Sequence, residues 1–270
     1  MIRDITIGQY YPADSVIHRL DPRVKLMGTI VFLISLFLFD HFVGYIIATL
    51  FLGCAIKMSK VPLKFMVKGL KAIFMLLAIS VVFNLFLTDG VVVFQIWKIK
   101  VTQEGIRMAV FMAIRLVYLI LGSSLMTLTT TPNDLTDGME KAMSPLRKLR
   151  VPVHEISMMM SIALRFIPIL LEETDKIMKA QQARGADFES GNLIRRAKSM
   201  IPILVPLFIS AFRRANDLAM AMEARCYRGG EGRTKMKPLQ YRKRDYITYG
   251  IYIGYLLAVV GVNLAWQRWM

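Results

Sequence analysis

The sequence predicts an all-α membrane protein with about five transmembrane helices and a cytoplasmic domain built from two long amphipathic helices and one short helix. Three observations predict this class. Apolar residues make up 55% of the 270-residue chain, long apolar runs recur along it, and a highly charged segment separates the last run from the others. A soluble fold is the less favoured class for such a composition.

Four apolar runs predict an N-terminal membrane domain over residues 1–128. They cover residues 24–39, 42–56, 72–87 and 106–128. The first two are near the short limit for a span and are expected to form a tight hairpin. Alternating residues between the third and fourth runs, 91–101, predict a short β-hairpin or an extended loop. A C-terminal transmembrane helix is expected within residues 246–270.

Residues 129–245 predict the cytoplasmic domain. Thr131, Pro132 and Asp134 are typical of a helix start, so a short helix is expected from there to about Met143. Apolar residues at helical spacing then predict two long helices, in which charged residues fall off the apolar stripe. We expect both to be too charged to span lipid, and a glycine pair, 229–230, to end the second.

The distribution of charge predicts the orientation. The chain has a net charge of +16, and residues 129–245 hold 21 of its 35 Lys and Arg residues and 13 of its 19 acids. Five basic residues also crowd residues 57–71 without an acid. Both segments are cytoplasmic if the N-terminus is cytoplasmic and the C-terminus extracellular in the cell membrane. This pattern fits cytoplasmic loops better than a nucleic-acid-binding face, so no nucleic acid is expected as a partner.

The sequence contains no pattern that predicts catalysis or a cofactor. It lacks a glycine-rich phosphate-binding loop of the Gly-x-x-x-x-Gly-Lys-Ser/Thr type, and its three histidines are scattered. No serine, cysteine or histidine stands in a nucleophile motif. We therefore expect a protein without a catalytic site, a bound metal or a cofactor.

Two arginines stand out because each ends a long amphipathic helix between small residues. The two motifs are Ala183-Arg184-Gly185 and Ala224-Arg225-Cys226. An arginine at a helix C-terminus can simply complement the helix dipole and hydrogen-bond the last carbonyls. The repetition favours a second interpretation, in which two fork-shaped donors grip carboxylates on two copies of a partner.

These motifs resemble the transmembrane T component of energy-coupling factor (ECF) transporters, which take up vitamins and transition metals. Nearly the whole chain shares the resemblance. It is also carried by residues 8–10 (Gly-Gln-Tyr), 20–26 (Leu-Asp-Pro-Arg-Val-Lys-Leu), 131–135 and 163–168 (Ala-Leu-Arg-Phe-Ile-Pro). Cys226 departs from the pattern, which has glycine there, and this puts the local backbone geometry in question.

The resemblance implies a non-enzymatic subunit of an ABC-type importer with two kinds of partner. Arg184 and Arg225 would dock into two ATPase subunits. The apolar face of the long helices would receive a membrane-embedded substrate-binding component that can be exchanged for others, and the bilayer would surround the spans. The residues assigned to this face are Met158, Met159, Ala163, Ile167, Phe208, Phe212 and Ala215.

A self-contained secondary transporter or channel is the alternative. Its intramembrane polar site would be formed by Arg115 and Asn84. This alternative is the weaker one, because much of the chain forms charged helices and few polar residues lie in the apolar runs.

Overall fold

The computed structural model describes most of the chain. The described residues are 10–39, 41–96, 99–186, 188, 192, 194, 198–230, 236 and 238–269, of which 68–72, 93–96, 99–101 and 266–269 are described by their backbone alone. Residues Gly8 and Gln9 of the N-terminal motif, and Asp40 between the first two apolar runs, lie outside this set.

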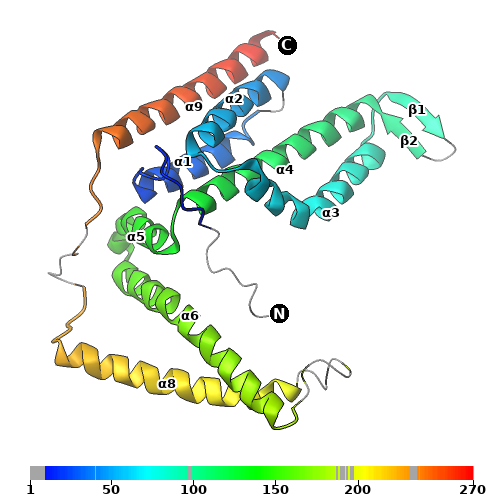
Figure 1. The fold of residues 1–270 in the computed structure, drawn as a ribbon. Helices are drawn as coiled ribbons and strands as arrows, with labels where there is room; N and C mark the ends of the chain where they lie inside the picture. The colour runs from blue at the N-terminus through cyan, green and yellow to red at the C-terminus, as the bar shows by residue number, and fades with distance from the viewer. Residues whose placement is uncertain are drawn as a thin grey trace. The chain divides into compact units, whose positions relative to one another are not determined.

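Helices dominate the described chain (Figure 1). In order, the elements are α1 (Pro22–Ser35), α2 (Phe42–Ser59), α3 (Leu63–Leu87), β1 (Val92–Ile96), β2 (Ile99–Thr102), α4 (Gln103–Thr129), α5 (Pro132–Ala142), the 3-10 helix η2 (Ser144–Leu149), α6 (Val153–Ala183), α8 (Ile201–Ala224) and α9 (Lys243–Trp269). The predicted hairpin between the third and fourth apolar runs is present, since β1 and β2 pair antiparallel.

The short helix α5 begins as its sequence indicates. The backbone N–H of Asp134 donates to Thr131 Oγ1 at 3.2 Å, and the Thr131 hydroxyl donates to Asp134 Oδ2 at 2.7 Å. Pro132 occupies the first helical position, where its missing N–H has no cost. These contacts fix the point at which the chain leaves α4 and turns into α5.

Among the described residues, α2, α4, α6 and residues 243–265 of α9 are long and apolar enough to cross a membrane. The predicted class, an all-α multi-pass membrane protein, is confirmed. The number of spans stays a prediction. Helix α1 is not in the set, because its 14 residues cover only about 21 Å of a hydrocarbon layer roughly 30 Å thick. In α3 the side chains of residues 68–72 are not described, and the stretch that follows them, Ile73–Leu87, is apolar.

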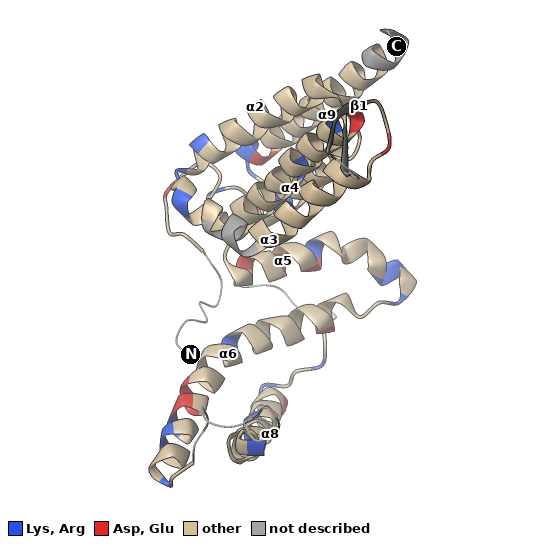
Figure 2. Cartoon of the chain, turned by 90° about the vertical axis from the view of Figure 1, so that its right-hand side faces the viewer, with Lys and Arg blue, Asp and Glu red and all other residues tan. Residues whose placement is uncertain are grey.

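Helix α6 corrects one expectation. We expected it to be too charged to span lipid, yet its length and composition are sufficient for a span. The reason is that its charges are unevenly placed. The first half carries Glu155 and Arg165, whereas Glu172, Glu173, Asp175, Lys176 and Lys179 crowd the second half. Figure 2 shows the same contrast between long uncharged stretches of α4 and the charged end of α6.

The chain forms two compact units. The first, called the bundle here, comprises residues 8–138 and 239–270, so that α9 returns to the N-terminal helices. The second, called the α6–α8 unit, comprises residues 139–238. The boundary falls inside α5. How the units divide between membrane and cytoplasm stays a prediction.

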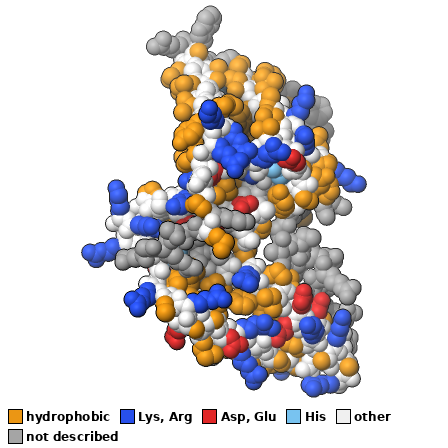
Figure 3. Space-filling view, turned by 60° about the vertical axis from the view of Figure 1, so that its left-hand side comes forward, with side chains coloured by type: hydrophobic (Ala, Val, Ile, Leu, Met, Phe, Trp, Pro, Cys, Tyr) orange, Lys and Arg blue, Asp and Glu red, His pale blue; other side chains and the backbone are white. Residues whose placement is uncertain are grey.

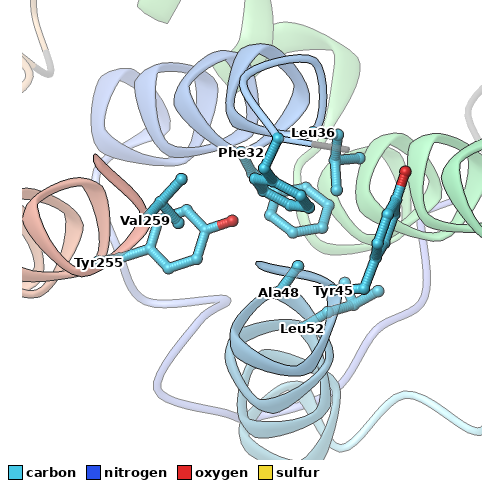
Figure 4. Packing of buried hydrophobic residues seen from close by; sticks show 8 residues of the cluster. Phe32, Leu36, Tyr45, Ala48, Leu52, Tyr255 and Val259 are labelled. Carbon is cyan, nitrogen blue, oxygen red and sulfur yellow. The ribbon is translucent and has the colours of Figure 1, made fainter. Parts of the chain in front are cut away.

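The core of the bundle lies where α1, α2 and α9 meet (Figure 4). Leu36 and Ala48 are fully buried, and Tyr255 reaches across from α9 to share a 2.7 Å hydrogen bond with Ser35. A small residue also allows α4 to approach α1 closely: a Cβ at Gly122 would come within 2.8 Å of the Phe32 ring. Close packing through small residues is a principal source of helix association in membranes.

The N-terminal Asp-Pro-Arg motif ties α1 to the start of α9. The backbone N–H of Asp21 donates to Asp245 Oδ1 at 3.0 Å, and Asp245 is 1% exposed. Arg23 donates two hydrogen bonds to the Asp21 carboxylate and stacks over the ring of Tyr241. Burial opposes ionisation of Asp21, but the hydrogen bonds from Arg23 outweigh it and lower the pKa of that carboxyl. This motif is therefore structural.

Candidate functional site

Helices α6 and α8 pack against each other as an antiparallel pair. Gln181 near the end of α6 donates to the carbonyl of Pro202 at the start of α8, at 3.5 Å. Farther along, Arg214 Nη2 lies 2.9 Å from Glu173 Oε2 and forms an ion pair. Figure 1 shows the two helices meeting near the C-terminal end of α6 and diverging from there. A groove of about 300 Å³ opens between them.

The first arginine motif closes α6 with a Schellman turn. Arg184 is the last residue with a near-helical φ, −86°, and Gly185 takes a left-handed φ of +86°. The N–H of Gly185 donates to the carbonyl of Gln182 at 2.9 Å, and the N–H of Ala186 donates to that of Gln181 at 3.0 Å. These two hydrogen bonds define the motif and satisfy carbonyls at the helix end.

The second arginine motif closes α8 in the same way. Arg225 has a φ of −92°, and Cys226 takes the left-handed φ of +54°. The N–H of Cys226 donates to the carbonyl of Glu223 at 2.8 Å, and the N–H of Tyr227 donates to that of Met222 at 3.0 Å. The glycine pair that we expected to end this helix comes too late: α8 ends at residue 224. Cys226 takes the backbone conformation that glycine has in the first motif.

Both guanidinium groups are available for a partner. Arg184 and Arg225 are exposed, and neither makes a side-chain hydrogen bond or ion pair with the part of the chain that the structure describes. Pro202, next to Gln181, and Arg225 are 23 residues apart along the chain. Because a helix rises 1.5 Å per residue, the two tips are separated by roughly 35 Å. We call these two helix ends, residues 183–185 and 224–226, the arginine tips.

The apolar face assigned to a substrate-binding partner is largely open in this chain. Met159 is 59% exposed, Phe208 is 60% and Phe212 is 57%, whereas Ile167 is at 36%. Ala163 and Ala215 are exposed and Met158 is half-buried. Figure 3 shows hydrophobic side chains of the α6–α8 unit at the surface between acidic and basic ones. The side chains that line the groove between the helices are others, such as Phe166, Leu170 and Leu218, although Ala215 also reaches it.

The Glu173–Arg214 ion pair is a feature that sequence reasoning missed. The two glutamates at 172–173 suggest a solvated face, but Glu173 is 23% exposed and faces the other helix. Opposite charges on both helices are visible in the sequence. Only the register of the helices shows which of them meet.

The residues of the alternative transport site have local partners. The Asn84 side chain donates to the carbonyl of Ser80 within its own helix at 2.8 Å. Arg115 Nη2 donates to the carbonyl of Phe39 at 3.3 Å, and its guanidinium lies over the ring of Phe37. Neither contact joins Asn84 to Arg115, so these contacts do not build a shared polar site.

Comparison with known proteins decides the family. The family model described as CbiQ, cobalt transport protein, matches residues 13–236, which include both arginine tips. The chain belongs to this family. The family's matched region thus spans the bundle helices α1–α4 as well as the whole α6–α8 pair.

Similar curated proteins carry the name energy-coupling factor transporter transmembrane protein EcfT. The protein from Clostridium kluyveri is 59% identical over 250 residues, which cover 92% of both chains. That from Ruminiclostridium cellulolyticum is 53% identical over 96% of this chain and 97% of its own. That from Bacillus subtilis is 49% identical over 91% and 93%. The resemblance to the T component of ECF transporters is confirmed.

Proposed function

We propose that the chain is the transmembrane coupling subunit of an ECF-type ABC importer. It transmits ATP-driven motion of two ATPase subunits to a membrane-embedded substrate-binding component, for uptake of vitamins or other micronutrients. ATP hydrolysis takes place in the partners, and this chain is not an enzyme. The N-terminus is cytoplasmic and the C-terminus extracellular. The names of the relatives support the transporter assignment, and the matched arginine tips carry the coupling role.

The hydrogen bonds of the tips argue against a purely capping role for the arginines. A capping arginine would hydrogen-bond the last free carbonyls of its helix. In both tips, two of those carbonyls already accept backbone N–H groups: Gln181 and Gln182 in the first, Met222 and Glu223 in the second. The guanidinium groups are therefore free to grip carboxylates of a partner through two parallel hydrogen bonds.

The separation of the tips suits two docking sites rather than one. At roughly 35 Å apart by the rise of α8, the tips can each engage a different ATPase subunit. The Schellman turns fix each arginine to the end of a long helix. A displacement of either ATPase is then transmitted along α6 or α8, which act as stiff levers. The exposed apolar face of these helices is where the substrate-binding component rests, and that component can be exchanged for others.

Substitution of the arginines tests this function. Removing one partner of a desolvated charge pair costs about 2–5 kcal/mol, so Arg184→Ala or Arg225→Ala should weaken ATPase docking at least tenfold. The double variant should lose most docking and substrate uptake. Arg→Lys at either tip should also dock poorly, because lysine keeps the charge but lacks the planar fork.

The measurement is co-purification of the ATPases together with substrate uptake in cells. Arg213→Ala is the matched control, since it removes an exposed arginine from α8 outside the tips. Should the arginines only cap their helices, the loss would be about 0.3–1 kcal/mol of local helix stability with assembly intact. Wild-type assembly and uptake in the double variant would refute the coupling role.

A further inference from the structure

The bundle contains a cavity that the coupling role does not use. Its volume is about 250 Å³, and residues of α1, α2, α4 and α9 line it. On α4 the lining extends from Gly122 to Thr129, which is about 10 Å along the helix axis. Most of the wall is apolar, with Phe32, Phe51 and Ile251 among its side chains. The cavity is larger than engineered apolar cavities of roughly 150 Å³ that bind benzene.

The threonine hydroxyl groups in this wall are already occupied. Thr29 Oγ1 donates to the carbonyl of Lys25, Thr129 Oγ1 to that of Leu125, and Thr248 Oγ1 to that of Arg244. Each of these bonds lies within one helix. A polar solute would therefore find few free partners along the wall, whereas a hydrocarbon chain needs none.

Lys25 places a buried positive charge at the wall. Its side chain is 7% exposed, and its Nζ donates to the carbonyls of His18 at 3.1 Å and Thr129 at 2.7 Å. An ammonium group has three donors, so one remains. Within the described residues no carboxylate forms an ion pair with Lys25, although the charges of Asp134 and Asp21 attract it from farther away. Buried lysines are usually paired.

Arg244 adds a second cation near the same place. Its charge acts repulsively on Lys25, and it lies one turn before Thr248, which lines the cavity. The Arg244 Nε is enclosed and has no hydrogen-bond partner among the described residues. An apolar cavity with two cations close to one of its walls fits an amphiphile that carries an anionic group.

We propose that this cavity holds one acyl chain of an anionic phospholipid, whose phosphate accepts a hydrogen bond from Lys25 and faces Arg244. The bilayer supplies this ligand at high concentration around the bundle. The acyl chain fills a space that is too apolar to hold ordered water, and the phosphate forms the direct ion pair with Lys25 that no carboxylate of the described residues forms. The site is independent of the arginine tips.

Native mass spectrometry of the transporter, purified with its partner subunits in mild detergent, tests this site. Dioleoyl phosphatidylglycerol and dioleoyl phosphatidylcholine are titrated separately. The wild type should bind phosphatidylglycerol at least tenfold more tightly than phosphatidylcholine. Ala55→Leu, which enlarges a side chain in the wall, should weaken phosphatidylglycerol binding at least tenfold. Gly53→Leu is the control on the same helix, because nothing lies within 4 Å of a Cβ there.

The cations are tested with Arg244→Gln and Lys25→Met. Each should reduce the preference for phosphatidylglycerol over phosphatidylcholine at least threefold. Arg244→Gln serves if Lys25→Met fails to fold, since Lys25→Met loses two hydrogen bonds to backbone carbonyls, one of them buried. Equal binding of the two lipids by the wild type, or unchanged phosphatidylglycerol binding by Ala55→Leu, would overturn the proposal.

Cys54, which is free and exposed in the cavity wall, gives a second readout. Phosphatidylglycerol should slow its alkylation by N-ethylmaleimide at least fivefold in the wild type and not in Ala55→Leu. An alkylation rate that phosphatidylglycerol leaves unchanged in the wild type would also contradict the site. Neither result depends on ATPase docking, so the proposed function is tested separately.

Discussion

The bundle and the α6–α8 unit differ in how they use their apolar residues. In the bundle, fully buried side chains from several helices meet around Leu36 and Val259. In α6 the buried residues are only Val153 and Ser157 near its start, and α8 has none among its described residues. The bundle therefore has a core of its own. The α6–α8 unit has an apolar surface that its own packing leaves open, as expected of a surface that partners cover.

The largest expected effect concerns topology, that is, on which side of the membrane the α6–α8 unit and the C-terminus lie. A reporter fused after Gly230 should be cytoplasmic and one at the C-terminus extracellular, because the distribution of Lys and Arg favours that arrangement. The measurement is the activity of paired reporters that work on only one side of the membrane. If both fusions report the same side, α9 does not span, and the bundle loses its predicted C-terminal transmembrane helix.

A charge placed on the open face of the α6–α8 unit should disrupt assembly. Ala163→Asp and Ala215→Asp would each leave an unpaired charge buried beneath the partner, which costs about 3–5 kcal/mol. The isolated chain should tolerate both, because Ala163 and Ala215 are exposed in it. Complex yield and the melting temperature of the isolated chain are measured together. Unchanged yield for both variants would count against the assigned face.

Truncation of one large side chain in each region should separate stability from assembly. Leu36 is 0% exposed, so Leu36→Ala should lower the stability of the chain in detergent by about 2–5 kcal/mol. Phe212 is 57% exposed, so Phe212→Ala should cost the isolated chain less than about 1 kcal/mol and weaken assembly instead. Denaturation midpoints measure the stability of the isolated chain, and complex yield measures assembly. Equal destabilisation of the chain by both variants would remove the distinction between the regions.

The smallest expected effects concern the left-handed residue of each arginine tip. Cys226 holds a positive φ that costs a side-chain-bearing residue roughly 1–2 kcal/mol, so Cys226→Gly should stabilise the end of α8 by about that much. Gly185→Ala should destabilise the end of α6 similarly. Nothing lies within 4 Å of a Cβ at Gly185, so the cost is confined to the backbone. Hydrogen exchange at the last turns of both helices measures these changes. Destabilisation by Cys226→Gly, or stabilisation by Gly185→Ala, would contradict the shared geometry.

The sequence was sufficient to predict most of the elements because their signals are local. Apolar runs and helical spacing indicate the helices, and Thr131 with Asp134 indicates the start of α5. The lengths were less certain. Helix α1 has 14 residues and is shorter than its apolar run of residues 24–39. Simple counting also missed that the charges of α6 gather in one half, which leaves this helix apolar enough for a span.

The contacts between distant residues could not be predicted in the same way. Asp21 meets Asp245 across 224 positions of the chain, and Glu173 meets Arg214 only in one register of α6 against α8. Cys226 stands where the family pattern has glycine, so the backbone conformation of the second tip could not be predicted. A cysteine adopts a positive φ only where neighbouring hydrogen bonds hold it there. The shared Schellman turn supplies those bonds.

Protection of Cys226 is the most direct measurement of the central claim, that the arginine tips dock into the ATPases. Cys226 is exposed and adjoins Arg225, whereas Cys54, the other cysteine of the chain, lies in the bundle. The rate of alkylation of each cysteine by N-ethylmaleimide is compared between the isolated chain and the ATPase-bound complex in one detergent. If the tips dock, the ATPases should slow the alkylation of Cys226 at least tenfold and leave the alkylation rate of Cys54 unchanged. An equal rate at Cys226 with and without the ATPases would contradict the account.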